Sequence, residues 1–362
     1  MTKTAVVLFN LGGPDSLDAV QPFLFNLFSD PAIISLPSPL RWLLARLITR
    51  RRVPIAKDIY RQMGGCSPLL EQTRAQAEAL ERQINDEGGD QTRVFIAMRY
   101  WHPMTDEAVG QVLTFAPDHV VLMPLYPQFS TTTTGSSVEA WQRSAEAAGL
   151  TSPTVTVCCY PVDDLFVRAH AQAIDQALRS IVTKQSRGLG DVQILFSAHG
   201  LPKKVIDRGD PYAWQVEQTA AAVASCLQSD IYGWNNLDWR VCYQSRVGRL
   251  EWIGPATKDV IAEAAEAGKR LVVTPIAFVS EHAETLVELD VEYRMLAEQK
   301  GATGYLRVPA LAAHEDYISS LAGLVKFAGH AKASVEVCPA AGERYCPAEQ
   351  SQCLACRGGE EI

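Results

Sequence analysis

Apolar runs alternate with amphipathic stretches along most of this chain. Eight runs rich in Val, Ile, Leu and Phe predict β-strands, at Thr4 to Leu11, Val94 to Trp101, His119 to Pro127, Thr154 to Tyr160, Val192 to His199, Trp239 to Ser245, Arg270 to Phe278 and Tyr305 to Val308. Most are nearly continuous in apolar residues, which is typical of strands buried on both faces of a parallel sheet. Alanine-rich stretches between them predict helices, for example at Thr73 to Ile84, Ala213 to Leu227 and Lys258 to Ala267. Because strands and helices alternate, we expect an α/β fold with parallel sheets.

The strands fall into two sets of four, and the two halves of the chain resemble each other. Val7 to Pro14 is similar in pattern to Leu195 to Pro202, and Val121 to Leu125 is similar to Val272 to Ile276. We therefore predict two similar, doubly wound, Rossmann-like lobes, each with a four-stranded parallel sheet, and a cleft between them. The predicted lobes are 1–165 and 166–312, a helix at 313–330 packs back on the first lobe, and 331–362 is a cysteine-rich tail.

Composition narrows the range of partners. The chain has 362 residues, of which 47% are hydrophobic, and a net charge of −8, which argues against nucleic acid as the main partner. The N-terminus has no signal-peptide pattern, and no apolar run approaches the roughly 20 residues of a membrane span. We therefore expect a cytoplasmic protein, soluble or peripheral on the inner face of the membrane. Gly12-Gly13-Pro14 fits neither common nucleotide loop, so we expect no organic cofactor.

A row of acids follows the seventh predicted strand. Glu284, Glu288 and Glu292 are spaced four apart, so they share one face of a helix. Like charges at this spacing destabilise a helix, and such a row is most often a solvated face. This row, however, begins at the carboxyl end of a buried strand, where open α/β sheets place their ligands. It is suited to conducting protons or a hard divalent cation into a pocket.

A histidine ends the fifth predicted strand. His199 is followed directly by the turn residues Gly200, Leu201 and Pro202, which would present the imidazole at the edge of the sheet. A histidine at a strand end is more often structural than catalytic, but the turn favours a functional role.

Together these segments resemble the ferrochelatases, which insert ferrous iron into a porphyrin in the last step of haem biosynthesis. Ser-Ala-His-Gly-Leu-Pro at 197–202 and the segment from Pro275 to Asp290 carry the resemblance, and it extends from Asn10 to about Leu311. It also covers Tyr60 to Gly65, Met98 to Pro103, Leu125 to Ser130, Thr133 to Ser137, Tyr243 to Gly248 and Trp252 to Pro255. The resemblance implies the two-lobed chelatase fold, and a porphyrin substrate that is protoporphyrin IX or, alternatively, coproporphyrin III.

The resemblance also implies a set of site residues. His199 and Glu284 match the family's active-site pair, with the histidine as proton acceptor or as a ligand of the ferrous substrate and the glutamate as its partner. Glu281, Glu288 and Glu292 would form a proton or metal path. The porphyrin would contact Leu11, Tyr60, Arg99, Tyr126 and Trp252. Arg99 would either pair with a propionate or form an ion pair inside its lobe. An upstream porphyrin-producing enzyme is a candidate partner.

A basic, apolar segment lies at 36–53. Leucines, Trp42 and Ile48 alternate there with five arginines, at 41, 46, 50, 51 and 52. This pattern fits a core helix with a basic rim, and equally a surface lip that touches anionic lipid. The resemblance favours the lip, because ferrochelatases guard the porphyrin pocket with such a segment.

Four of the nine cysteines crowd the last 25 residues: Cys338, Cys346, Cys353 and Cys356. Four thiolates can hold zinc or a [2Fe–2S] cluster. Some ferrochelatases carry a [2Fe–2S] cluster on one internal and three C-terminal cysteines. One internal family position is Thr131 here, and Cys158 matches the alternative position in bacterial members. We therefore predict a cluster on Cys158, Cys346, Cys353 and Cys356, with Cys338 as a rival ligand.

Two other functions fit parts of the pattern. A cobalt or nickel chelatase would share the fold but not the long run of ferrochelatase-like motifs. A haem- or tetrapyrrole-binding iron–sulfur sensor would not need an acidic row beside a strand-end histidine.

Overall fold

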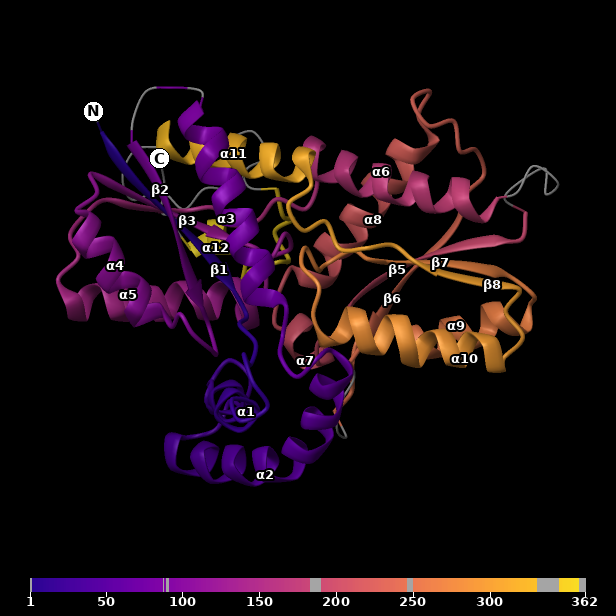
Figure 1. Ribbon diagram of the computed structural model, residues 1–362, viewed down its shortest axis with the longest axis horizontal. Helices are drawn as coiled ribbons and strands as arrows, with labels where there is room; N and C mark the ends of the chain where they lie inside the picture. The colour runs from indigo at the N-terminus through magenta and orange to yellow at the C-terminus, as the bar shows by residue number, and fades with distance from the viewer. Residues whose placement is uncertain are drawn as a thin grey trace.

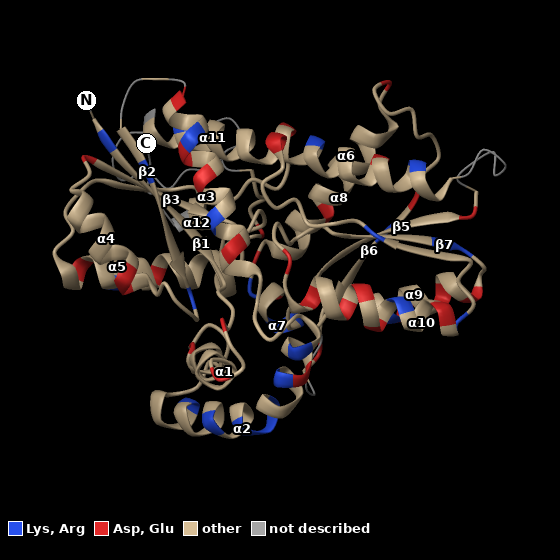
Figure 2. Cartoon of the chain, in the orientation of Figure 1, with Lys and Arg blue, Asp and Glu red and all other residues tan. Residues whose placement is uncertain are grey.

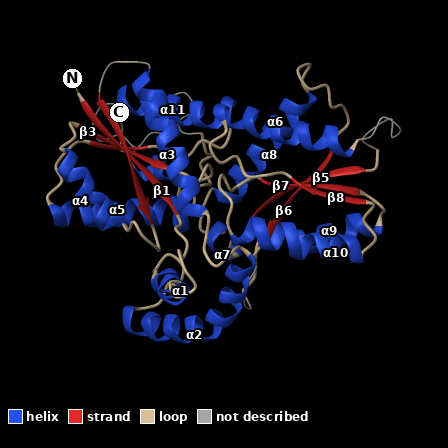
Figure 3. Cartoon of the chain, viewed as in Figure 1, coloured by secondary structure: helices blue, strands red, loops and turns tan. Residues whose placement is uncertain are grey.

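Two parallel four-stranded sheets lie side by side in the computed structural model, which describes residues 2–86, 88, 91–182, 190–245, 250–330 and 345–357 (Figures 1 and 3). The first sheet has the order β2-β1-β3-β4 and the second the order β6-β5-β7-β8. The strands are β1 (Lys3–Asn10), β2 (Gln91–Met98), β3 (His119–Pro124), β4 (Thr154–Thr156), β5 (Val192–His199), β6 (Asp238–Gln244), β7 (Arg270–Pro275) and β8 (Gly304–Arg307). The predicted fold is confirmed: all eight predicted strands form, and every pairing is parallel.

Helices cover both faces of each sheet. Those of the first half are α1 (Val20–Ser29), α2 (Ser38–Gln62), α3 (Leu69–Asp86), α4 (Thr105–Phe115), α5 (Ser136–Ala148) and α6 (Asp164–Ile181). The rest are α7 (Lys203–Ile206), α8 (Tyr212–Gln228), α9 (Thr257–Glu266), α10 (Tyr293–Gln299), α11 (Glu315–His330) and α12 (Leu354–Arg357). Two π-helices, η1 (Thr131–Gly135) and η2 (Glu284–Glu292), complete the set within the described residues.

The central strand of each sheet explains the continuous apolar runs. Successive side chains of a strand point to opposite faces. Val6 and Leu8 of β1 therefore pack into a core with α3 and α11, while Val7 and Phe9 pack into a second core with α4 and α5. In the second sheet Phe196 of β5 faces α6 and α8, and Leu195 faces α9 and α10. Burying both faces requires apolar residues at every position, which removes the alternation of a half-exposed strand.

Polar side chains join the two halves. Gln76 of α3 donates its amide to the carbonyls of Val279 (3.2 Å) and Ala312 (3.1 Å). In the other direction, the backbone N–H of Phe129 donates to Gln215 Oε1 of α8 at 2.7 Å. All these groups are buried or part-buried, so each hydrogen bond compensates the cost of removing polar atoms from water. The late helix α11 packs against α3 and β3, which places it on the first sheet (Figure 1).

Two local expectations need correction. The strands β3, β4 and β7 end earlier than the apolar runs suggest, at Pro124, Thr156 and Pro275. Proline has no N–H to continue a ladder, so the apolar residues after Pro124 and Pro275 line loops instead. The acidic segment forms the π-helix η2 rather than a regular α-helix. A π-helix is a rare conformation that occurs frequently at functional sites.

Candidate active site

His199 is the last residue of β5 and lies at the carboxyl edge of the second sheet. It pairs in register with Gln244 of β6, and the next N–H, that of Gly200, donates to the Gln244 carbonyl at 2.8 Å. Tyr212 also hydrogen-bonds the His199 backbone. The imidazole itself is 37% exposed. The backbone is thus fixed while the ring stays accessible.

His199 and Glu284 form a hydrogen-bonded pair. The imidazole Nδ1 lies 2.8 Å from Glu284 Oε2, so the strand end and the start of η2 meet. Burial alone would lower the pKa of His199, but the Glu284 charge and hydrogen bond outweigh it and raise the pKa above its ordinary 6.5. Burial would likewise raise the pKa of Glu284, yet the charge and hydrogen bond of His199 lower it to about 2. Glu284 is therefore ionised, and it directs the Nδ1 proton toward itself.

His282 supports the pair without joining it. Its Nδ1 accepts a hydrogen bond from the Glu284 backbone N–H at 3.2 Å, and its ring meets Phe278 edge-on with a centroid distance of 4.4 Å. Burial lowers the pKa of His282, so it stays neutral. This histidine is a structural hydrogen-bonding residue at the beginning of η2.

The acidic row continues from Glu284 to Glu288 through Ser245. Ser245 Oγ lies 2.7 Å from Glu284 Oε2 and 2.5 Å from Glu288 Oε2, and the Ser245 N–H donates to Glu288 Oε1 at 3.0 Å. Glu292 is exposed; partial desolvation and the Glu288 charge raise its pKa. Sequence analysis did not single out Ser245, because its signal is a backbone φ of 60°, which a sequence does not display.

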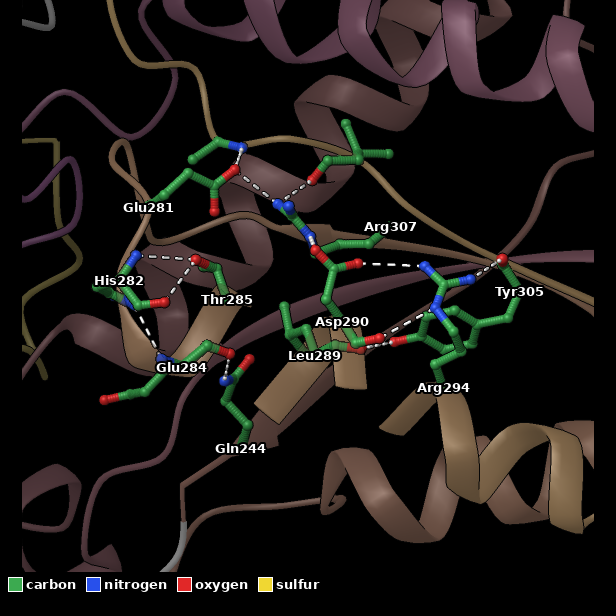
Figure 4. A network of polar contacts seen from close by, with 12 residues as sticks. Gln244, Glu281, His282, Glu284, Thr285, Leu289, Asp290, Arg294, Tyr305 and Arg307 are labelled. Atoms are coloured by element: carbon green, nitrogen blue, oxygen red, sulfur yellow. Dashed lines mark hydrogen bonds and ion pairs between the residues drawn. The ribbon is translucent and has the colours of Figure 1, made fainter. Parts of the chain in front are cut away.

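Glu281 lies apart from the row (Figure 4). Its Oε1 forms an ion pair with Arg307 at 2.7 Å, and Arg307 also binds Asp290 at 2.7 Å. The Ala310 N–H donates to the same Glu281 oxygen at 3.0 Å. A carboxylate held by an arginine is a poor site for a passing cation, so we do not assign Glu281 to the proton or metal path.

The predicted porphyrin-contacting residues come from several elements. Tyr60 is a buried residue near the end of α2. Burial raises its pKa, and the Glu284 charge raises it further, which indicates that Tyr60 lies close enough to Glu284 to sense its charge. Leu11 follows β1 and packs beside Tyr60 in the same apolar cluster. Tyr126 follows β3 and is half-buried. Trp252 forms an isolated bridge with Pro202, in the turn after His199.

Arg99 is engaged inside its own lobe. Its guanidinium pairs with Asp30 at 2.6 Å, and its Nε donates to Ser136 Oγ at 2.8 Å. Tyr100 and Ser136 also donate to Asp30, so this carboxylate has an arginine and two hydroxyl partners. The structure thus has the internal ion pair, one of the two alternatives raised by the sequence.

Three of the cysteines predicted to hold a cluster, Cys158, Cys346 and Cys353, lie near one another. Cys158 Sγ lies 3.9 Å from Cys353 Sγ, and Cys346 hydrogen-bonds to Cys159 and Cys353. Gln215 Nε2 reaches Cys346 at 3.0 Å and Cys159 at 3.3 Å. Cys338 and the side chain of Cys356 lie outside the described residues. Within the described part of the chain, no three His, Cys, Asp or Glu side chains are arranged to hold a metal ion.

Most of the basic, apolar segment at 36–53 belongs to α2, and several of its apolar side chains are exposed. Leu40 (56% exposed), Leu43 (58%) and Trp42 (47%) do not enter a core, so the core-helix alternative is wrong for them. Figure 2 shows basic residues along α2, which lies at the edge of the molecule. No helix in the described residues is both long and apolar enough to cross a bilayer.

The two-lobed fold of parallel four-stranded sheets is found in solved structures of other proteins. SirB from Bacillus subtilis, solved with Fe³⁺, has a similar fold, with a TM-score of 0.52 at 11% identity over 91% of this chain and 96% of that one. At this identity the likeness concerns the fold alone.

Sequence comparison defines the family. The ferrochelatase family model matches residues 3–328. A ferrochelatase of Caulobacter vibrioides is 53% identical over 99% of this chain and 98% of its own, and one of Pelagibacter ubique is 46% identical over 97% and 98%. The chain belongs to the ferrochelatase family, whose activity is the insertion of ferrous iron into a porphyrin in haem biosynthesis.

Proposed function

We propose that His199 and Glu284 are the catalytic pair of iron insertion into protoporphyrin IX. The observation that carries this proposal is the 2.8 Å hydrogen bond between His199 Nδ1 and Glu284 Oε2 at the edge of the second sheet. Because ionised Glu284 holds the Nδ1 proton, Nε2 carries the lone pair of a neutral imidazole. That nitrogen is a suitable base for a pyrrole proton.

Glu284 then stabilises the imidazolium that forms. Insertion releases two protons from the porphyrin, so protons must leave the pair for solvent in each turnover. Glu288 and Glu292 follow Glu284 along η2 toward solvent, and Glu292 is exposed. We assign them the outward route for protons.

The residues expected to contact the porphyrin would act on the ring. Leu11, Tyr126 and Trp252 would supply apolar contact, and a rigid apolar wall helps to hold a distorted macrocycle. Arg99, already paired with Asp30, would shape the wall rather than neutralise a propionate. Tyr60 would close the side of the pocket that faces Glu284.

Zinc insertion provides the test. Zinc porphyrin is fluorescent, so its formation from protoporphyrin IX and from coproporphyrin III can be followed directly with the purified protein. We expect the higher kcat/KM with protoporphyrin IX. A higher kcat/KM with coproporphyrin III would assign the other substrate and leave the catalytic pair in place.

We also propose that α2 touches anionic lipid. Five arginines surround its exposed apolar residues, and each basic residue near an anionic surface contributes roughly 1 kcal/mol. Sedimentation with vesicles should show binding that depends on anionic lipid and weakens with salt. Binding that ignores lipid charge and salt would contradict the proposal.

A [2Fe–2S] cluster on Cys158, Cys346, Cys353 and Cys356 is our third proposal. The 3.9 Å distance between Cys158 Sγ and Cys353 Sγ and the hydrogen bond between Cys346 and Cys353 support it, and thiolates are the ligands such clusters use. The bound cluster would add metal–thiolate bonds that tie the tail to the first lobe.

Two variants separate the ligand sets. Cys158→Ser should abolish the visible absorption and the paramagnetic signal of the reduced cluster, while Cys338→Ser should leave both. The reverse result would mean a cluster held by the tail alone, and a colourless zinc protein from iron-replete cells would contradict both sets.

A further inference from the structure

The Ser245 hydroxyl lies between two carboxylates. Its Oγ is 2.7 Å from Glu284 Oε2 and 2.5 Å from Glu288 Oε2, both within the range of charge-assisted O–H···O bonds. A serine has one hydroxyl proton, so Ser245 donates to one of the two carboxylates at a time. The contact with the other carboxylate can then be made by a proton that arrives on that carboxylate.

The other hydrogen bonds fix the two ends of this bridge. Glu284 Oε2 accepts from His199 Nδ1 at 2.8 Å, and Glu288 Oε1 accepts from the Ser245 N–H and from the Tyr293 hydroxyl at 2.7 Å. Glu288 Oε2 also accepts from Gln244 Nε2 at 3.2 Å. Through the Ser245 hydroxyl these contacts give a continuous chain from His199 to Glu288.

The backbone conformation of Ser245 is unusual for a serine. Its φ of 60° is in the left-handed region, which favours glycine and costs other residues conformational free energy. Such outliers cluster at functional sites. Glycine here would relax the backbone but remove the hydroxyl that joins the two acids.

We propose that Ser245 relays protons from Glu284 to Glu288, an inference that rests on the proposed role of His199 as base. At the start the Ser245 hydroxyl donates to Glu288 Oε2. Imidazolium then passes its Nδ1 proton to Glu284 Oε2, which donates a hydrogen bond to Ser245 Oγ.

The transfer closes by a concerted shift of two protons. The Glu284 proton moves to Ser245 Oγ while the Ser245 proton moves to Glu288. One proton has then left His199 through Nδ1 and lies on Glu288, from which it passes toward Glu292 and solvent. Glu284 is ionised again, and His199 is neutral and keeps the pyrrole proton on Nε2.

Ser245→Ala tests the relay by zinc insertion. We expect kcat to fall about tenfold, less than the roughly 100-fold or more that an acid or base in direct contact with the substrate contributes, with KM for zinc and porphyrin within about twofold of wild type. Rates measured in H₂O–D₂O mixtures provide a second test. Their dependence on deuterium fraction would not change if Ser245 had only a structural role. The wild-type dependence on deuterium fraction should be curved, as for several protons in flight, and that of the variant should lose this curvature.

Ser229→Ala is the matched control. Its hydroxyl is part-buried after the end of α8 and donates to the Cys226 carbonyl at 2.6 Å, outside the acidic row. It should keep the curved dependence and a kcat within about twofold of wild type. Ser245→Gly, which relaxes the backbone, should show the Ser245→Ala defect, and it decides the question should the alanine variant not fold.

The outcomes separate the two proposals. A wild-type kcat and curvature in both Ser245 variants, with His199→Ala inactive, would overturn the relay alone. Activity retained in His199→Ala would overturn the catalytic pair and the relay together.

Discussion

The two lobes share one plan and differ in what their strand ends carry. The sheet orders β2-β1-β3-β4 and β6-β5-β7-β8 correspond strand for strand. Matching Val7 to Pro14 with Leu195 to Pro202 puts Leu11 in the first lobe where His199 stands in the second. In each lobe the third strand is followed by a π-helix, η1 with four threonines and η2 with three glutamates.

The surroundings of the two π-helices differ accordingly. Asp210 of the second lobe accepts hydrogen bonds from Ser130 Oγ (3.0 Å), Thr131 N (2.8 Å) and Thr131 Oγ1 (2.7 Å), which fastens η1 at a buried contact. The acids of η2 instead face His199 and Ser245 and extend to the exposed Glu292. The same backbone feature therefore serves as an attachment point in one lobe and as a carrier of titratable groups in the other.

Glu284→Gln should have the largest effect on the second lobe. It keeps the shape of the side chain but removes the charge that stabilises imidazolium, so we expect kcat for zinc insertion to fall at least about 100-fold, or about 2.7 kcal/mol. A small loss, equal to that of Glu292→Gln, would reduce the acidic row to a solvated face.

Asp210→Asn should weaken the attachment of η1 to the second lobe without affecting the catalytic pair. The carboxylate is buried and accepts several donors, and an amide would turn N–H groups toward them. We expect the free energy of unfolding to fall by about 2 kcal/mol, with kcat of the folded protein little changed. Denaturant unfolding measures the first quantity. A large loss of kcat at unchanged stability would mean that η1 also takes part in the chemistry.

The pKa of His199 should respond to Glu284 with a predictable sign. In the wild type it lies above 6.5, so the pair stabilises the fold fully below that pH and this contribution is lost as pH rises through the raised pKa. On the acid side, the contribution is lost as pH falls toward the Glu284 pKa of about 2. In Glu284→Gln the effect of burial remains, so NMR titration should place the His199 pKa well below the wild-type value. An unchanged pKa would contradict the pairing.

Glu292→Gln should have the smallest effect. The side chain is exposed and two steps along the row from Glu284, so water can replace it in carrying protons. We expect kcat within about threefold of wild type, a change under about 0.7 kcal/mol in the barrier. A loss as deep as that of Glu284→Gln would make Glu292 an obligatory part of the route.

Much of this arrangement was predictable from the sequence, for identifiable reasons. Continuous apolar runs give strands buried on both faces, and the turn after His199 places it at the sheet edge. The contacts of the acids were not predictable: Glu281 follows the same strand, but Arg307, 26 positions later, captures it. Ser245 was missed because its importance lies in its φ and in which atoms it touches. The π-helical form of η2 was missed because a spacing of four also fits an α-helix.

His199→Ala beside Leu11→Ala tests the central claim most directly, because the two residues hold the same place in the two lobes. Zinc insertion into protoporphyrin IX should fall below about a tenth of the wild-type kcat in His199→Ala, a barrier increase above about 1.4 kcal/mol, with folding intact by circular dichroism. Leu11→Ala should mainly raise KM for the porphyrin. More than a tenth of the wild-type kcat in a folded His199→Ala protein would remove this histidine from the chemistry.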